Sequence, residues 1–258
     1  MPSVLHWNPH RRLARRGALR VIRLPSRVNN FGDLLGPLIV RRLLARLAVP
    51  ARFTGSPRLL SVGSILHMAQ QGDIVWGSGV NGKISQEFFP PLDVRAVRGP
   101  LTARSLRRSG IAVPDVFGDP ALLLPHLWSR EELGIRQGTG GTVYVPNLHD
   151  RAAFPPESLD PRGDPLSKVA QIASAQQVVA SSLHGIIIAD AFDVPVSLVA
   201  SPSEPTFKYE DYFEGTGRPL PRLAPTWRDA APSDVGALSW DPAPLIGAFP
   251  DEIWRERP

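Results

Sequence analysis

Short apolar runs that end in glycine, serine or a charged residue recur through the first half of the chain. They cover residues 18–24, 58–62, 73–76 and 93–97, and a shorter run lies near Val116. Their length is typical of buried strands rather than of helices. We expect these strands to form a parallel sheet, whose carboxyl edge carries the glycines and polar residues that follow each run.

Two helices are expected between these strands. Leucine and isoleucine recur at helical spacing over residues 33–47, and Asp33 stands where a side chain can cap the first turn. Pro100 precedes a second predicted helix at residues 101–108, and proline is favoured at the first position of a helix. This alternation of strands and helices is typical of an α/β fold.

The second half of the chain repeats this pattern after a polar, glycine-rich segment at residues 131–141. Apolar periodicity predicts strands at residues 142–146, 177–180 and 196–199 and helices at residues 166–175, 184–192 and 206–213. After Gly215 the chain is rich in proline, alanine and aspartate. We expect this tail to pack across the body of the protein, with Trp227, Trp240 and Trp254 as its anchors.

The whole pattern predicts an α/β protein of two Rossmann-like lobes with parallel sheets and an interlobe cleft. The N-terminal lobe is expected over residues 1–130 and the C-terminal lobe over residues 142–215. A loop-rich tail over residues 216–258 is expected to complete the chain. Ligands of open α/β sheets bind beyond the carboxyl ends of the strands, so functional residues are expected there.

The composition excludes several kinds of chemistry. The 258 residues include no cysteine, so disulfides, thiolate metal sites and cysteine nucleophiles are excluded. The sequence offers no clear metal-binding cluster, and we expect neither a metal nor a resident cofactor. No apolar run approaches the roughly 20 residues that cross a bilayer. We therefore expect a cytoplasmic protein.

The chain is basic, with a formal net charge of +5, and its arginines gather at residues 10–16 and 41–46. Such segments suit polyanions, anionic lipid surfaces or phosphorylated small molecules, although a solvated basic surface is the simpler explanation. Aromatic residues are not interleaved with the basic ones, so we expect no nucleic-acid partner. Peripheral contact with the inner face of an anionic membrane is one use of these segments that the sequence allows.

The most informative stretch of the chain is Ser181-Ser-Leu-His-Gly185. It follows the predicted strand at residues 177–180 and opens a predicted helix, which places Ser182 and His184 at the carboxyl edge of a sheet. Free backbone N–H groups and the helix dipole favour anions at such a position. Because imidazole exchanges protons near neutral pH, the motif predicts an anion site beside an acid–base group.

Taken in order, the motifs of the chain resemble those of the polysaccharide pyruvyl transferase family. The resemblance is carried by Asn30-Phe-Gly-Asp33, Asp73-Ile-Val-Trp-Gly-Ser-Gly79, Val97-Arg-Gly-Pro-Leu-Thr-Ala103, Phe117-Gly-Asp-Pro-Ala121, Ser181-Ser-Leu-His-Gly185 with Asp190, and Phe207-Lys-Tyr-Glu-Asp-Tyr212. It implies a fold similar to that of two-lobed GT-B glycosyltransferases. It also implies that pyruvate moves from phosphoenolpyruvate onto two hydroxyls of a sugar in a polysaccharide or lipid-linked precursor, forming a cyclic ketal.

The implied reaction needs a general acid, a general base and groups that bind an anionic donor. The resemblance makes His184 and Asp33 the candidate catalytic residues and Arg98 the main donor-binding cation. The other donor-binding candidates are Lys208, Ser181, Ser182, Gly185, Gly77 and Ser78, and the acceptor-binding candidates are Asn30 and Asp211. Some family members have an arginine where this chain has Ser182, and a hydroxyl binds phosphate without neutralising it.

Several candidates also have a purely structural interpretation. Asp33 serves equally well as a helix cap, and Asp119 before a proline is typical of a turn. Asp190 lies six residues beyond His184 and off its helix face, so we expect it to be structural. His149 is a weak candidate for the cleft.

Two other functions stay open. The first is a GT-B glycosyltransferase that uses a nucleotide sugar, which needs a pocket for base and ribose that does not stand out in the sequence. The second is a non-catalytic subunit that binds a glycan or an anion during polysaccharide assembly, and the serine at position 182 favours it.

Overall fold

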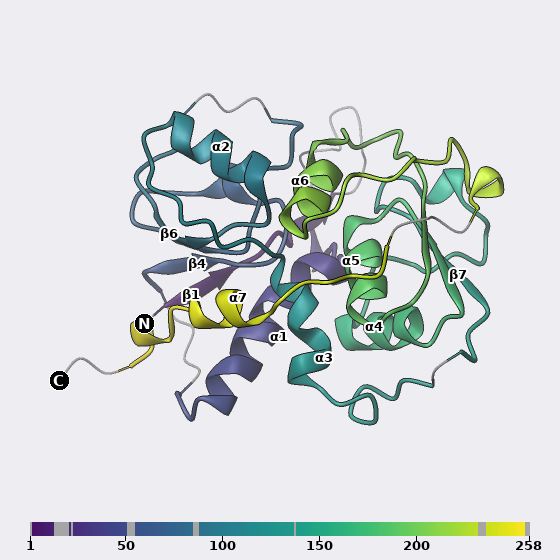
Figure 1. Cartoon of the computed structure of the whole chain (residues 1–258), viewed down its shortest axis with the longest axis horizontal. Helices are drawn as coiled ribbons and strands as arrows, with labels where there is room; N and C mark the ends of the chain where they lie inside the picture. Colours follow the sequence, from purple (N-terminus) through teal and green to yellow (C-terminus); the bar gives the residue numbers. More distant parts are fainter. Residues whose placement is uncertain are drawn as a thin grey trace.

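Two parallel sheets form the framework of the protein (Figure 1). A computed structural model describes residues 2–12, 21, 23–50, 55–84, 88–136, 138–231 and 236–255. The four-stranded sheet has the order β1 (Ser3–Leu5), β4 (Arg58–Leu60), β5 (Ile74–Trp76), β6 (Asp93–Ala96). The three-stranded sheet has the order β7 (Thr142–Val145), β8 (Gln177–Ala180), β9 (Val196–Leu198).

Alternating side chains bury both faces of the four-stranded sheet. Leu59 and Trp76 belong to the same apolar cluster as helix α1 (Phe31–Arg46). Their neighbours in the chain, among them Leu60 and Val75, belong to a second cluster with helix α2 (Pro100–Arg108). Since successive strand residues point to opposite faces, the two helices cover opposite sides of this sheet.

The three-stranded sheet is covered in the same way. One face packs against helices α4 (Pro165–Ala173) and α5 (Leu183–Ala191). Val179 on the other face belongs to a small cluster to which Phe154 and Trp227 contribute. Helix α6 (Phe207–Gly215) comes after this sheet in the chain but contacts α2, which covers the other sheet.

The remaining elements are short. Strands β2 (His10–Arg12) and β3 (Arg23–Arg27) form an antiparallel pair. The short helices are η2 (Leu66–Met68), η3 (Pro120–Leu123), α3 (Leu124–Leu127), η4 (Arg151–Ala153), η5 (Trp227–Asp229), α7 (Ala243–Gly247) and η6 (Asp251–Ile253). None of the helices in the described ranges is long and apolar enough to cross a membrane.

A single apolar cluster connects the two sheets and the tail. It contains core residues of both sheets, of α1 and α5, and of the tail. Trp76 Nε1 donates a hydrogen bond to the carbonyl of Leu245 at 2.8 Å. Trp254 is buried, Trp240 Nε1 donates to the carbonyl of Phe117, and Trp227 packs edge-on against a tyrosine ring. Each of the three tryptophans of the tail thus packs against other residues of the protein.

The α/β class and the two parallel sheets are confirmed, whereas the GT-B-like arrangement of lobes stays a prediction. The sequence missed β1, which lies at the edge of the four-stranded sheet. The run predicted as a strand at residues 18–24 lies largely outside the described residues, and only its end belongs to β3. The run near Val116 forms a single bridge between Val97 and Phe117 rather than a strand.

The prediction that Asp33 caps helix α1 was wrong. The helix begins at Phe31, so that Asn30 occupies the cap position and Asp33 lies in the first turn. The apolar periodicity started at Leu34, but Phe31 is also buried and extends the packed face towards the N-terminus. This shift leaves the carboxylate of Asp33 available to the cavity described next.

Candidate active site

A cavity of about 250 Å³ lies beyond the carboxyl ends of strands from both sheets. Its described lining is Trp7, Asn30, Asp33, Ser64, Ile65, His67, Asn81, Lys83, Asn147, Leu148, His149, Ser182, Leu183, His184, Glu204 and Lys208. These residues follow strands of both sheets or lie at the starts of α1, α5 and α6. The cavity therefore occupies the position where open α/β sheets bind their ligands.

The imidazole of His184 is held between the start of α1 and Asp119. A Cβ atom on Gly32 would lie only 2.1 Å from Nδ1 of His184, so the absence of a side chain at Gly32 makes room for the ring. On its other side, Nε2 lies 3.9 Å from Oδ2 of Asp119. Neither of these two atoms has a hydrogen-bond partner among the described residues. Buried polar atoms without a hydrogen-bond partner are rare in folded proteins.

Burial keeps His184 neutral. Desolvation lowers the pKa of its imidazole to about 3, and the positive charges of Lys208 and Arg98 lower it further in the same direction. The ring is thus unprotonated near neutral pH, and in the absence of a ligand it is a weak base. An anion bound nearby would oppose the two cations and raise this pKa towards the range useful for catalysis.

Two carboxyl groups of this site have raised pKa values. Desolvation raises the pKa of Asp119 to about 6, against the opposing effects of the Ala121 amide and Arg98. Desolvation also raises the pKa of Asp33 to about 6, although Asn30 opposes it through a hydrogen bond of 2.6 Å from Nδ2 to Oδ2. Both carboxyls therefore exchange protons close to neutral pH, as general acids and bases must.

Two lysines on the cavity wall share one carboxylate. Nζ of Lys208 lies 3.1 Å from Oε2 of Glu204, and Lys83 pairs with Oε1 of the same side chain. Burial is the main cause that lowers the pKa of Lys208. Arg98, the donor-binding cation expected from the sequence, is absent from the described part of the lining. Lys208 and Lys83 are the cationic side chains of that part.

Arg98 lies behind the wall of the cavity rather than on it. Its guanidinium is fully buried and donates to Asp211, to Oγ of Ser64 at 2.6 Å and to the carbonyl of Val80 at 2.7 Å. Asp211 is equally buried and also accepts bonds from the amide and hydroxyl of Thr102. Neither Arg98 nor Asp211 reaches the described lining, since their polar groups are used within the protein. Direct ligand binding by these two residues stays an untested prediction that this geometry does not favour.

Of the three candidates in the serine motif, only Ser182 lines the cavity. Ser182 lines the cavity and caps α5, because its hydroxyl accepts a hydrogen bond of 3.3 Å from the amide of Gly185. A Cβ atom on Gly185 would lie 2.7 Å from a methyl group of Val145, which indicates a packing role. Ser181 is fully buried and does not belong to the described lining.

Gly77 and Ser78 also make internal contacts. Gly77 has a φ of 89°, and a Cβ atom there would lie 2.3 Å from the ring of Pro120. Ser78 is fully buried and donates its hydroxyl proton to the carbonyl of Gly63 at 2.8 Å. These residues shape the carboxyl edge of the four-stranded sheet but do not appear in the described lining. Their proposed contact with a donor stays a prediction.

A buried carboxylate, that of Asp150, lies next to cavity residues from the second half of the chain. Asp150 is only 2% exposed and accepts hydrogen bonds from the hydroxyls of Ser181, Ser201 and Ser203 at 2.9, 2.7 and 2.7 Å. These residues come from the loops that follow β7, β8 and β9. The cluster therefore ties together three loops that contribute to the cavity wall.

Sequence reasoning missed several residues of this site. Lys83, Glu204 and Asn81 line the cavity from loops, and His67 lines it from the short helix η2, all without a recognisable motif. The spacing of four residues between Glu204 and Lys208 was the one available signal, because such pairs meet on a helical turn. The weak candidate His149 does line the cavity, and Asp190 is structural as expected, paired with Arg218 at 2.6 Å.

Comparison with known proteins supports the resemblance seen in the motifs. Residues 30–203 match the family model described as Polysaccharide pyruvyl transferase, and they include most of the cavity wall. The chain belongs to the polysaccharide pyruvyl transferase family. The Succinoglycan biosynthesis protein ExoV of Rhizobium meliloti (strain 1021) is 32% identical to this family member over 234 residues, covering 83% of this chain and 71% of ExoV. No solved structure matches the chain.

We predict that Asp119→Asn stabilises the protein at high pH. The folded pKa of Asp119, about 6, exceeds the ordinary value of 3.8, so its contribution favours folding below pH 3.8 and is lost as the pH rises through 6. At pH 8 the amide replaces a buried charge, and the free energy of unfolding should rise by on the order of 2 kcal/mol. The gain should disappear at pH 4, as measured by urea unfolding at both pH values.

The matched control is Asp115→Asn, because Asp115 is 76% exposed and pairs with Arg107 on the surface. It should change the free energy of unfolding by less than about 0.5 kcal/mol at either pH. Equal effects of the two substitutions would contradict the burial of a charge at Asp119.

Proposed function

We propose that this protein transfers pyruvate from phosphoenolpyruvate onto a sugar of a polysaccharide or lipid-linked precursor and forms a cyclic ketal. One observation carries the proposal: the neutral, buried imidazole of His184 lies 3.9 Å from Asp119, and it lines the same cavity as Asp33 and two lysines. Both of these carboxyls have raised pKa values. The family membership supports the reaction class, and the printed name of ExoV supports a polysaccharide as the product. The meeting of two parallel sheets at the cavity supports a cleft between two lobes.

The donor carries a phosphate and a carboxylate, which must be bound without an arginine from the described lining. Lys208 and Lys83 supply the positive charge, and the hydroxyl of Ser182 lies at the N-terminus of α5, where the helix dipole favours anions. Arg98 acts indirectly, because it holds Ser64 through a hydrogen bond and its positive charge lowers the pKa of His184. Arg98 and Asp211 are thus assigned to positioning the wall.

The chemistry needs one proton delivered and two removed. The carboxyl of Asp33 in its protonated form gives a proton to the methylene carbon of the donor, and C2 becomes cation-like. A sugar hydroxyl attacks C2 while His184 takes its proton, and inorganic phosphate leaves. A second hydroxyl then closes the ketal. The two sugar hydroxyls lose two protons. One of them returns to the enzyme in place of the proton given to the new methyl group, and the other leaves with phosphate.

The acceptor sugar is expected next to Asp33 and Asn30. Asn30 lines the cavity and donates from its amide to Asp33, so its carbonyl oxygen is available to a sugar hydroxyl. His149 and Asn147 lie on the wall formed by the three-stranded sheet. Hydroxyl-rich ligands suit a wall of amide and imidazole groups, because each of these groups both donates and accepts hydrogen bonds.

We predict that the protein releases phosphate from phosphoenolpyruvate only when a galactoside or lipid-linked glycan acceptor is present, and that the acceptor gains a pyruvate ketal by mass spectrometry. His184→Ala should lower kcat by about 100-fold or more, since general acid–base groups contribute about that much. The control His126→Ala changes an exposed histidine outside the described lining and should leave kcat unchanged.

Other outcomes of this assay point to the other candidate functions. Turnover of a nucleotide sugar in place of phosphoenolpyruvate would indicate a glycosyltransferase. Binding of phosphoenolpyruvate without turnover under any acceptor would indicate a non-catalytic subunit. Equal kcat for both histidine variants would remove His184 from the chemistry.

We predict that kcat falls as the pH rises above about 6, because Asp33 must be protonated to act as the acid and its pKa is raised to about 6. The hydrogen bond from Asn30 lowers this pKa, so Asn30→Ala should move the falling limb to higher pH. Asn30 makes no side-chain cap bond to α1, so the substitution leaves the helix start intact. If the fall in kcat instead reflected an ionisation of the donor, it would occur at the same pH in the variant. Measuring kcat against pH for the native protein and for Asn30→Ala decides between ionisation of Asp33 and ionisation of the donor.

We also predict that Asp150 positions the cavity residues. Its partners Ser181 and Ser203 are chain neighbours of Ser182 and Glu204, and Asp150 itself follows His149. Asp150→Ala should lower kcat by roughly 10- to 100-fold through misplacement of these groups. Asp150→Asn keeps one acceptor oxygen and should restore part of the activity.

Asp190→Asn is the matched control for this variant, because Asp190 is also a buried carboxylate with a hydroxyl partner, Tyr212, but lies outside the described cavity lining. It should destabilise the protein without lowering kcat. If kcat follows the free energy of unfolding in all three variants, Asp150 has a stabilising role only.

A further inference from the structure

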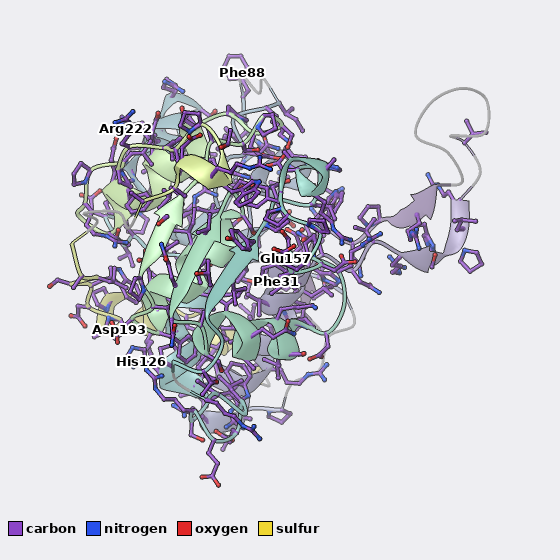
Figure 2. The ribbon with its side chains drawn as sticks, turned by 90° about the vertical axis from the view of Figure 1, so that its right-hand side faces the viewer. Phe31, Phe88, His126, Glu157, Asp193 and Arg222 are labelled. Carbon is purple, nitrogen blue, oxygen red and sulfur yellow. The ribbon has the colours of Figure 1, made fainter. Side chains whose placement is uncertain are left out.

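The antiparallel pair β2–β3 begins and ends at the rim of the cavity. Trp7 precedes β2 and Asn30 follows β3, and both residues line the cavity. At the base of the pair, Asn8 and Asn29 exchange hydrogen bonds of 3.0 and 2.9 Å. Figure 2 shows the two strands standing away from the body of the protein. We call the described residues of this element, 10–12, 21 and 23–27, the basic arm.

The basic arm carries positive charge that no acidic side chain of its own segment balances. His10, Arg11, Arg23 and Arg27 are exposed. The first 32 residues of the chain contain seven arginines and neither aspartate nor glutamate. A concentration of exposed arginine without acidic neighbours attracts anionic surfaces.

The outer edges of the arm also carry backbone groups that an external partner can bind. Two-stranded ribbons are marginally stable in water on their own, and their outer edges keep unpaired backbone groups. The described strands pair only with each other. Val21, on the same arm, is 74% exposed. The arm thus combines arginine with an apolar side chain in a projecting position.

We propose that the basic arm docks on an anionic lipid bilayer and holds the mouth of the cavity at the membrane surface. Arginine near an anionic bilayer binds its phosphate groups, and apolar residues between the arginines enter the interfacial layer. Residues 8–30 contain no phenylalanine, tyrosine or tryptophan, so the arm lacks the large aromatic platforms with which proteins bind single-stranded nucleic acid. The choice of a lipid surface rests on the proposed function, because a lipid-linked acceptor would be presented there.

The test is sedimentation of the full chain with vesicles of phosphatidylcholine and phosphatidylglycerol at 0.1 M salt. The double variant Arg11→Gln, Arg23→Gln leaves Arg27, which donates to the carbonyl of Asn8 at the base of the arm. Each arginine near such a surface contributes about fivefold in partitioning, so this variant should bind roughly 25-fold more weakly. Vesicles of phosphatidylcholine alone should not sediment the protein.

The control variant Arg104→Gln, Arg108→Gln changes two exposed arginines of α2, which do not line the cavity. Both variants have a formal net charge of +3, since each loses two charges from +5. Equal loss of vesicle binding in both would mean that net charge alone drives binding and would overturn the proposal. Binding of the native chain to duplex DNA but not to vesicles would also overturn the proposal. A concentration-dependent dimer that forms in place of vesicle binding, and that the arm variant abolishes, would overturn it as well.

Vesicle binding and pyruvyl transfer are measured separately. The arm variant should turn over a soluble galactoside with the native kcat. Loss of vesicle binding with retained turnover supports the docking surface, whereas a chain that turns over but never binds vesicles refutes it and leaves the proposed function intact.

Discussion

The buried ion pair between Arg98 and Asp211 is the interaction on which the cavity depends. Arg98 follows β6 of the four-stranded sheet, whereas Asp211 belongs to α6, which comes after the three-stranded sheet. A buried pair is tolerated only where its remaining donors and acceptors are satisfied. Here Ser64, Val80 and Thr102 supply those bonds. The pair thus joins the two halves of the chain at the position where their strand ends meet.

Close backbone contact around this pair fixes helix α6. A Cβ atom on Gly99 would lie 1.7 Å from the carbonyl oxygen of Asp211, and one on Gly215 would lie 2.3 Å from the carbonyl oxygen of Arg98. Because only glycine fits at both positions, α6 approaches the strand end more closely than side chains would permit. This approach brings Lys208, at the start of α6, to the cavity wall. Lys208 is therefore positioned by an ion pair that itself stays out of the described cavity lining.

Burial sets the protonation states in the cavity more than pairwise charge does. Desolvation is the largest cause of the pKa shifts at Asp33, Asp119, His184 and Lys208. It favours the neutral form of each group, so the acids keep protons longer and the bases lose them sooner. The described wall carries two lysines and two carboxyl groups, so its net charge depends on the protonation of Asp33. An anionic donor would thus itself change the proton affinity of the groups that act on it.

The sequence by itself determined the α/β class, most strands and helices, and the position of His184 at a strand end. These features follow from apolar periodicity and from capping residues, which act over a few neighbouring positions. Only the tertiary structure decided that Arg98 is a buried structural cation, that Lys83 and Glu204 reach the cavity, and that Asp150 ties three loops together. Each of these roles depends on contacts between residues far apart in the chain. Burial and pairing arise from such contacts, and local periodicity contains no information about them.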